Sequence, residues 1–301
     1  MASCSTCSSS STCSHSQNGG ENKSCPRQFK LQDQLITRTL KAIKHKIFIV
    51  SGKGGVGKSS VTVNLAAALS AKGYKVGIMD VDLHGPSVPN LLNLRFHIEV
   101  DPVDQRLLPV RYNENLAVIS MDSLLEDRNQ AILWRGPKKS SAIRQFLADV
   151  QWGNLDFLFI DSPPGTGDEH ITVLKSIPDA KCIVVTTPQE ISLADVRKAI
   201  NFLQYTNSEI LGLIENMSGF FCPNCGQKIN LFKKGGGQNL AENYGLEFLG
   251  AIPLDPVTVL AADRGIPVVS LEDRSHAKEA FMKLSDIIIK RVEKGANPKN
   301  A

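Results

Sequence analysis

The chain alternates short, almost wholly apolar runs with longer segments in which apolar residues recur every three or four positions. The runs predict buried strands over residues 47–50, 76–80, 155–161, 183–187 and 210–217. The longer segments predict helices over residues 61–72, 192–205 and 277–293. Apolar strands that alternate with helices are typical of parallel sheets. The pattern therefore predicts a three-layer α/β fold, with a mostly parallel sheet and helices on both faces.

A glycine-rich loop joins the first predicted strand to the helix after it. Residues 51–60 read Ser-Gly-Lys-Gly-Gly-Val-Gly-Lys-Ser-Ser and fit the pattern G-x-x-x-x-G-K-[ST]. Between a strand and a helix, backbone N–H groups of such a loop bind phosphate oxygens. Lys58 is expected to reach the β- and γ-phosphates of a nucleotide, and Ser59 to ligate Mg²⁺. The candidate nucleotide-binding residues of the loop are Gly52, Lys53, Gly54, Gly55, Val56, Gly57, Lys58, Ser59 and Ser60.

Carboxylates stand at the ends of two predicted strands. Asp80 ends one strand and Asp82 follows it, whereas Asp161 ends another strand and precedes a Pro-Pro-Gly-Thr-Gly loop. Ligands bind at the carboxyl ends of strands in open α/β sheets. These side chains are therefore expected to hold Mg²⁺, directly or through water, or to orient an attacking water. The loop after Asp161 is expected to sense the γ-phosphate through its backbone N–H groups.

The chain has seven cysteines, and six of them fall into two groups. These are Cys4, Cys7, Cys13 and Cys25 in the serine-rich start of the chain, and Cys222 and Cys225 in a C-x-x-C pair. The first group offers four thiolates, enough for Zn²⁺ or an iron–sulfur cluster, and the alternative is a flexible tail with exposed thiols. Cys182 lies in a strand pattern and is expected to be a small buried hydrophobe.

The C-x-x-C pair supplies two of the four ligands that a tetrahedral metal site needs. Three completions are open: the tail cysteines, ligands from outside the chain, or the same pair of a second copy across a two-fold axis. Zn²⁺ and a [4Fe-4S] cluster are both chemically acceptable on four thiolates. A metal-free or catalytic dithiol is the remaining interpretation.

Composition narrows the class of protein. The 301 residues carry a net charge of +4, which does not argue for a nucleic-acid partner. No apolar run approaches the roughly 20 residues that span a bilayer, and neither a secretory signal nor an organelle presequence is recognised. A cytoplasmic location without membrane or nucleic-acid partners is therefore expected.

Four regions are predicted along the chain. Residues 1–28 form a flexible tail with a possible metal site, and residues 29–45 an amphipathic leading helix. Residues 46–292 form the nucleotide-binding domain, with the C-x-x-C insertion at 222–225, and residues 293–301 a disordered C-terminus. The amphipathic stretch 277–293 is either a last core helix or a membrane-binding helix.

Several motifs, taken in order, resemble one known family. These are the glycine loop with its second lysine Lys53, the Asp-x-Asp of residues 80–82, Asp161 with Pro-Pro-Gly-Thr-Gly-Asp, Asn216-Met217-Ser218, the C-x-x-C pair, Gly235-Gly236-Gly237 and Pro253-Leu254-Asp255-Pro256. Their content and order resemble the Mrp/ApbC family of iron–sulfur cluster carrier ATPases, which belong to the deviant, MinD-like class of P-loop NTPases. The resemblance covers about residues 45–292.

The resemblance implies a homodimer that sandwiches ATP and hydrolyses it slowly. Lys53 would then reach the nucleotide of the second subunit, and Asp82 would position the attacking water, so that the implied catalytic set is Lys53, Lys58 and Asp82. Asp80 would lie nearer the metal shell, with Ser59 and Asp161.

The resemblance also implies roles for the second half of the chain. Asn216 would bind the adenine, with Pro253 and Asp255 closing over it. A labile [4Fe-4S] cluster would be bridged by Cys222 and Cys225 of two subunits and passed to apo iron–sulfur proteins.

Two other functions share parts of this pattern. A MinD/ParA-type positioning ATPase with a structural zinc knuckle would have the same nucleotide motifs, although such a protein does not need a C-x-x-C pair. A redox protein like the nitrogenase iron protein would use widely separated single cysteines.

Overall fold

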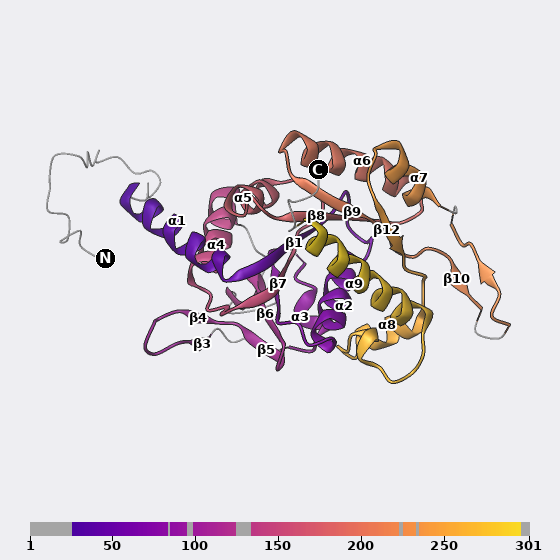
Figure 1. The fold of residues 1–301 in the computed structure, drawn as a ribbon, viewed down its shortest axis with the longest axis horizontal. Helices are drawn as coiled ribbons and strands as arrows, with labels where there is room; N and C mark the ends of the chain where they lie inside the picture. The colour runs from indigo at the N-terminus through magenta and orange to yellow at the C-terminus, as the bar shows by residue number, and fades with distance from the viewer. Residues whose placement is uncertain are drawn as a thin grey trace, which may run out of the picture.

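The computed structural model describes residues 26–83, 85–94, 99–124, 134–222, 225–232 and 235–295. The strands of its main sheet are β1 (Ile43–Ser51), β2 (Val76–Asp80), β5 (Val110–Asn113), β6 (Leu116–Ser120), β7 (Leu155–Asp161), β8 (Lys181–Thr186), β9 (Glu209–Glu215) and β12 (Phe248–Ala251). They are ordered β12-β9-β8-β1-β7-β2-β6-β5 (Figure 1). All neighbouring pairs are parallel except β5 with β6, which confirms the predicted mostly parallel sheet.

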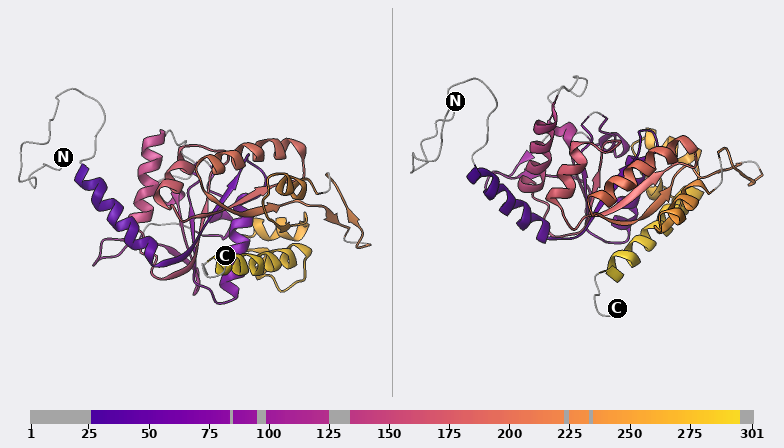
Figure 2. Two further views of the ribbon diagram at one scale, coloured as in Figure 1. Left: turned by 45° about the horizontal axis from the view of Figure 1, so that its top comes forward. Right: turned by 90° about the horizontal axis from the view of Figure 1, so that it is seen from above.

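Helices cover both faces of this sheet (Figure 2). One face carries α1 (Pro26–Lys41), α4 (Gly136–Asp149), α5 (Asp168–Ser176), α6 (Glu190–Tyr205) and α7 (Gly236–Asn243). The other carries α2 (Lys58–Ala71), α3 (Val88–Leu91), α8 (Pro256–Asp263) and α9 (His276–Gly295). Two antiparallel pairs lie outside the main sheet, β3 (Glu99–Val100) with β4 (Leu107–Leu108) and β10 (Phe220–Phe221) with β11 (Lys228–Ile229). Short 3₁₀ turns span Met121–Leu124 and Val268–Ser270.

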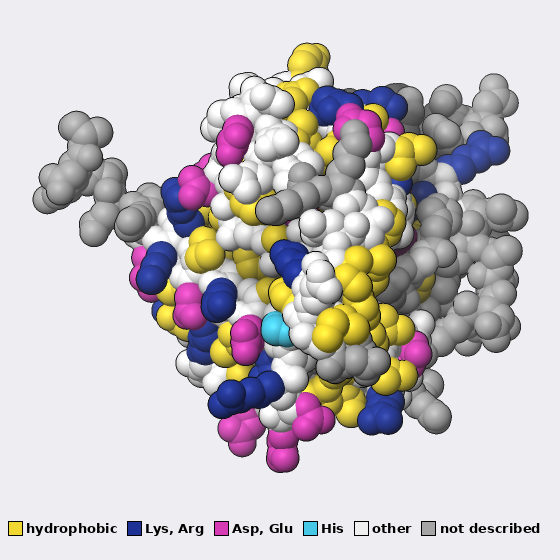
Figure 3. All heavy atoms as spheres, turned by 90° about the vertical axis from the view of Figure 1, so that its right-hand side faces the viewer, with side chains coloured by type: hydrophobic (Ala, Val, Ile, Leu, Met, Phe, Trp, Pro, Cys, Tyr) yellow, Lys and Arg dark blue, Asp and Glu magenta, His cyan; other side chains and the backbone are white. Residues whose placement is uncertain are grey.

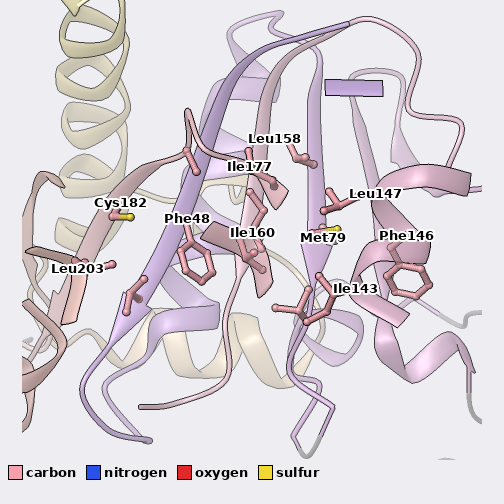
Figure 4. Packing of buried hydrophobic residues seen from close by; sticks show 14 of the residues in the cluster. Phe48, Met79, Ile143, Phe146, Leu147, Leu158, Ile160, Ile177, Cys182 and Leu203 are labelled. Atoms are coloured by element: carbon pink, nitrogen blue, oxygen red, sulfur yellow. The ribbon is translucent and has the colours of Figure 1, made fainter. Parts of the chain in front are cut away.

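Each central strand contributes side chains to two hydrophobic cores, because successive side chains of a strand point to opposite faces. In β1, Phe48 and Val50 pack under α4, α5 and α6, whereas Ile47 and Ile49 pack under α2 and α9. Figure 4 shows the first core, where Phe48 lies near Ile160. This two-sided burial is the reason why the strands read as unbroken apolar runs.

The leading helix and first strand begin earlier than the apolar pattern predicts. The helix ends at Lys41 rather than at residue 45, and β1 starts at Ile43. The polar positions at the start of β1 are accommodated by ion pairs at the edge of the core: Lys44 Nζ lies 2.7 Å from Asp156 and Lys46 Nζ lies 2.7 Å from Asp179. The first residues of β1 were therefore missed, because charged side chains interrupt the apolar pattern there.

The C-terminal amphipathic helix is a core helix. Its apolar side packs on the core beside α2, and its buried members are Ala277, Phe281, Leu284, Ile288 and Val292. The helix continues to Gly295, beyond the predicted boundary at residue 293, and residues 296–301 lie outside the described residues. None of the helices in the described ranges is both long and apolar enough to cross a membrane.

Candidate functional site

The glycine loop connects β1 to α2 at the carboxyl edge of the sheet. Gly57 has φ +81°, a left-handed conformation that glycine adopts without strain, and α2 begins directly after it at Lys58. Gly52 faces α6, where a Cβ atom would overlap the backbone of Asp195. Lys53 is half-buried, and its carbonyl accepts a hydrogen bond from Ser51 Oγ at 3.0 Å.

The remaining loop residues leave an open edge above the start of α2. Gly54 and Gly55 are exposed, Ser59 and Ser60 are half-buried, and Val56 is buried. The first turn of α2 thus presents its backbone N–H groups beside exposed glycines. This arrangement fits phosphate binding at a helix N-terminus.

Asp161 is the centre of a hydrogen-bonded cluster under this loop. Its Oδ1 accepts from Lys58 Nζ at 2.9 Å and from Thr62 Oγ1 at 2.9 Å, and its Oδ2 accepts from Ser59 Oγ at 2.5 Å. Asp161 is fully buried and Lys58 is 7% exposed. Thr62 was not among the sequence candidates, although its place one turn after Lys58 on the same helix face was a usable signal.

Asp80 lies beside Asp161 in the parallel register of β2 and β7. Its Oδ1 accepts from the Asp82 backbone N–H at 3.0 Å, and its Oδ2 accepts from Ser120 Oγ at 3.2 Å. Burial, followed by the charge of Asp161, raises the pKa of Asp80 well above its usual range. Asp82 is also buried, and its Oδ1 accepts from the Gly85 N–H at 3.2 Å.

These groups fit a magnesium ion. The Ser59 hydroxyl and the Asp161 carboxylate are hard oxygen donors in direct contact, and Asp80 adds a third oxygen group from the neighbouring strand. Mg²⁺ prefers such donors and retains several waters. The structure thus brings together the three predicted magnesium residues Ser59, Asp80 and Asp161.

The loop after β7, residues 162–167, lies against the glycine loop. The Gly165 N–H donates to the Ser51 carbonyl at 3.2 Å. The loop leads into α5, where the His170 Nδ1 accepts from the Gly167 N–H at 3.2 Å. His170 is fully buried, and burial lowers its pKa to about 4.

An ion pair attaches the start of α5 to α4. Lys139 Nζ lies 2.8 Å from Glu169 Oε1, and both side chains are largely buried. Burial alone would raise the pKa of Glu169, but the hydrogen bond and charge of Lys139 outweigh it and the net shift is downward. Gly136 allows the close approach, because a Cβ atom there would overlap the Asp168 carboxylate. Sequence reasoning assigned no role to this segment.

The predicted adenine-binding residues lie at the ends of β9 and β12. Asn216 is buried, and its Nδ2 donates to the Val56 carbonyl of the glycine loop at 2.8 Å. Asp255 precedes α8, where its Oδ1 accepts from the Val257 N–H at 2.9 Å and its Oδ2 from the Ala277 N–H of α9 at 3.4 Å. Pro253 stands between Asp255 and β12. Asn216 therefore contacts the glycine loop directly, whereas Asp255 caps two helices.

The C-x-x-C pair stands at the tip of the β10–β11 hairpin, which projects from the domain (Figure 1). Cys222 is half-buried and Cys225 is exposed. The Cys222 N–H donates to the Gln227 carbonyl at 3.0 Å, and the Gly226 N–H donates to the Cys222 carbonyl at 2.9 Å, so backbone hydrogen bonds hold Cys222 to the residues that follow Cys225. Directly before Cys222, Phe221 stacks on His276 of α9 with ring centroids 3.9 Å apart.

The other cysteines differ from this pair. Cys182 is buried in β8, as expected, and burial raises the pKa of its thiol to about 12. The tail cysteines Cys4, Cys7, Cys13 and Cys25 lie outside the described residues. Within the described part of the chain, no three His, Cys, Asp or Glu side chains are grouped so as to hold a metal ion. The hairpin pair therefore needs ligands from beyond this part of the chain to complete a four-coordinate site.

Residues 42–289 match the family model for the NUBPL iron-transfer P-loop NTPase, of the ParA group. The iron-sulfur cluster carrier protein of Methanocaldococcus jannaschii is 48% identical over 275 residues, which cover 89% of this chain and 93% of that protein. The Nubp2 homologue of Aedes aegypti, named a cytosolic Fe-S cluster assembly factor, is 50% identical over 245 residues, 79% of this chain and 94% of that protein.

Solved structures have the same fold. The nucleotide-binding protein of Archaeoglobus fulgidus, in complex with ADP, aligns with a TM-score of 0.68 and 37% identity, covering 81% of this chain and 98% of that one. The cell division ATPase MinD of Pyrococcus furiosus aligns with a TM-score of 0.60 and 25% identity, covering 82% and 98%. The resemblance read from the motifs is thereby confirmed: the chain belongs to the family of NUBPL iron-transfer P-loop NTPases, alongside proteins named iron-sulfur cluster carriers.

Proposed function

We propose that this protein binds and hydrolyses ATP and carries a labile [4Fe-4S] cluster, held between two copies of the chain, to apo iron–sulfur proteins. The observation that carries the proposal is the place of the cysteine hairpin. Its first arm follows Asn216, which contacts the glycine loop, and is hydrogen-bonded to residues 252–254, which lead to Asp255. The names of the carrier and assembly-factor relatives support the same cargo.

In the nucleotide half, each residue has a chemical task. The glycine loop and the start of α2 bind the phosphates, and Lys58 exchanges its Asp161 partner for phosphate oxygens. A magnesium ion at Ser59, Asp80 and Asp161 supplies electrostatic stabilisation of the phosphate charge when bound. Asp82 orients the attacking water, and Lys53 reaches the nucleotide of the second copy. Hydrolysis is slow in a single copy because the site is complete only across the dimer.

In the cargo half, the cluster is bound by four thiolates, Cys222 and Cys225 from each copy. The exposed position of Cys225 suits a cargo that must leave again. Hydrophobic side chains gather on the side of the molecule that carries the hairpin (Figure 3). The exposed large ones on the second hairpin arm and on α8 are Ile229, Leu231, Val259 and Leu260. Such a surface favours association with a second copy and with a recipient protein.

The proposal extends to location and partners. The Aedes relative is named a cytosolic factor, and we place this chain in the cytoplasm as well. Its partners are a second copy of itself and apo iron–sulfur proteins, with neither nucleic acid nor membrane among them.

Anaerobic reconstitution with iron and sulfide tests the cargo. The protein is the full chain with Cys4, Cys7, Cys13 and Cys25 changed to Ser, so that iron in the tail does not confuse the count. We expect about four iron and four sulfide per dimer, with dimerisation in sedimentation. Cys222→Ala should lose the iron and keep ATP binding, and the matched control Cys182→Ala should keep both.

Other outcomes are decisive. Stoichiometric iron and sulfide in the Cys222→Ala variant would refute the bridging site. Iron bound only when the tail cysteines are present would assign the missing ligands to the tail. Uptake of zinc alone would favour a MinD-like switch with a structural knuckle, and two iron per dimer would revise the cluster type.

A further inference from the structure

The carboxylate of Glu215 joins the two chain segments that enclose the cysteine hairpin. Its Oε1 accepts a hydrogen bond from Ser218 Oγ at 2.6 Å, and its Oε2 accepts one from the Gly237 N–H at 2.6 Å. Ser218 leads into the hairpin, and Gly237 lies at the start of α7, where the chain returns from it. Glu215 is 1% exposed, and the nucleotide chemistry described above does not use it.

The backbone at Glu215 is itself held in place by the main sheet. It ends β9, and its carbonyl accepts from the Ile252 N–H at 2.8 Å, while the Asn216 N–H next to it donates to the Thr186 carbonyl at 2.8 Å. A buried carboxylate is costly unless it is hydrogen-bonded. Two short hydrogen bonds and the positive end of α7 meet that requirement.

The same contact explains why residue 237 is a glycine. A Cβ atom there would lie 3.0 Å from Glu215 Oε2 and 3.1 Å from Leu213 Cδ2. Such distances are tighter than ordinary carbon contacts. A residue without a side chain therefore lets the α7 backbone approach the carboxylate closely enough to donate its N–H.

The hairpin has further attachments on its first arm. The Ser218 N–H donates to the Ile252 carbonyl at 2.8 Å, and the Leu254 N–H donates to the Gly219 carbonyl at 2.8 Å. Gly237 attaches the returning chain to the same carboxylate that holds Ser218. The Glu215 side chain thus fixes the distance between Ser218, where the chain enters the hairpin, and Gly237, where it returns.

We infer that Glu215 is a positioning residue for the cysteine pair: with Ser218 and Gly237 it forms a clamp that holds the base of the hairpin at a fixed place on the domain. The nature of the cargo rests on the proposed function, whereas the clamp concerns the hairpin alone. Because Asn216 follows Glu215 and donates to Val56, the clamp lies between the cysteine pair and the phosphate-binding loop.

The test uses the full chain without tail cysteines and compares Glu215→Ala, Glu215→Gln and Ser218→Ala. Amide hydrogen exchange over residues 219–232 should speed up about tenfold in Glu215→Ala, with β1 unchanged. A reconstituted cluster should be lost about tenfold faster, while ATP affinity stays within about threefold of the parent. Ser218→Ala, which removes one of the two bonds, should lie between.

The conservative variant and a matched control separate positioning from general stability. In Glu215→Gln the amide oxygen can accept from Gly237 and the NH₂ group can donate to Ser218, so exchange and cluster retention should return to about the parent values. The control Glu242→Ala removes an exposed carboxylate of α7 and should change nothing.

Three results would overturn the clamp: unchanged exchange over 219–232 in Glu215→Ala, faster exchange with unchanged cluster retention, or an equal loss of ATP binding and β1 protection. If the parent takes up no cluster, the proposed function fails and the exchange result alone decides the clamp. If Glu215→Ala does not fold, Ser218→Ala gives the same readouts.

Discussion

Lys58 Nζ lies 2.9 Å from Asp161 Oδ1, so the cation that the glycine loop offers to a nucleotide is already held by the carboxylate that ends β7. Both groups are buried, and Asp80 lies beside Asp161 in the sheet. Removal of the cation would leave neighbouring carboxylates without their positive partner. Stability and nucleotide binding are therefore linked at this pair.

Lys58→Met should abolish ATP binding and also destabilise the nucleotide-free protein by about 3 kcal/mol, because breaking a buried ion pair leaves an unpaired charge. The comparison is Lys72→Met. Lys72 follows the C-terminal end of α2 and forms a partly exposed ion pair with Asp286, so its loss should cost under about 1 kcal/mol. Urea unfolding without nucleotide measures both. Equal stability of the two variants would contradict the argument.

Asp80→Asn should stabilise the nucleotide-free protein at pH 8 and weaken Mg-ATP binding. The pKa of Asp80 is raised in the folded state, chiefly by burial. Above the usual aspartate pKa the folded protein therefore binds more protons than the unfolded chain, and its stability falls as pH rises. Asparagine does not ionise, so the variant does not lose stability in this way.

Thermal unfolding from pH 4 to 8 measures the difference. The melting temperature of Asp80→Asn should exceed that of the parent by roughly 2 °C or more at pH 8, and the difference should shrink towards pH 4. Asp101→Asn is the control. Backbone hydrogen bonds lower the pKa of Asp101, so this variant should gain nothing at pH 8. A gain that grew towards acid would reverse the assigned sign.

His170 should make the fold sensitive to mild acid. Burial lowers its pKa to about 4, whereas an unfolded histidine titrates near 6.5. The unfolded chain therefore binds the extra proton between these values, and stability is lost as pH falls through this window, by up to about 3 kcal/mol.

The variant His170→Gln isolates this effect. Glutamine keeps an acceptor for the Gly167 N–H but does not titrate. The unfolding free energy of the variant, measured by urea between pH 4 and 7, should therefore fall less steeply towards acid than that of the parent. Burial also lowers the pKa of His45, but His45 is present in both proteins, so its contribution cancels in the comparison. Parallel pH profiles would show that His170 does not carry the acid sensitivity.

The sequence was sufficient to predict features that depend on neighbouring residues and on the spacing of apolar positions. The strand ends at Asp80 and Asp161 and the loop at Lys58 were each recognised from residues next to them. Glu215 was missed because its role depends on a hydrogen bond from Gly237, which is distant in the chain. The contact of Lys139 with Glu169 was missed for the same reason. Contacts between distant segments depend on how α4 and α7 pack, which a periodic pattern does not specify.

Asn216→Ala should lower ATP affinity by about tenfold or more, through loss of the bond that supports the glycine loop and of the hydrogen bond to adenine that the family resemblance implies. The second effect should be visible without nucleotide. Hydrogen exchange of residues 52–57 should increase in the free protein, because Asn216 Nδ2 donates to the Val56 carbonyl. Asn239→Ala, on the exposed side of α7, is the control. Unchanged loop exchange would limit Asn216 to the base.

Lys58 should act on the nucleotide bound to its own copy of the chain, and Lys53 on the nucleotide bound to the second copy. Lys58→Ala should lose nucleotide binding, whereas Lys53→Ala should bind ATP within about threefold of the parent and lose most of its hydrolysis. Each variant alone is therefore expected to be inactive. Mixing them distinguishes action within one copy from action across the dimer.

In a mixed dimer, the Lys53→Ala copy keeps its own Lys58 and receives an intact Lys53 from the Lys58→Ala copy. Random exchange makes half of the dimers mixed, and each then holds one complete site, so about a quarter of the parent ATPase rate should return. Phosphate release, followed after mixing at equal concentrations and pre-incubation for subunit exchange, measures it. If Lys53 acted on its own nucleotide, neither copy of a mixed dimer would have a complete site, and no activity would return.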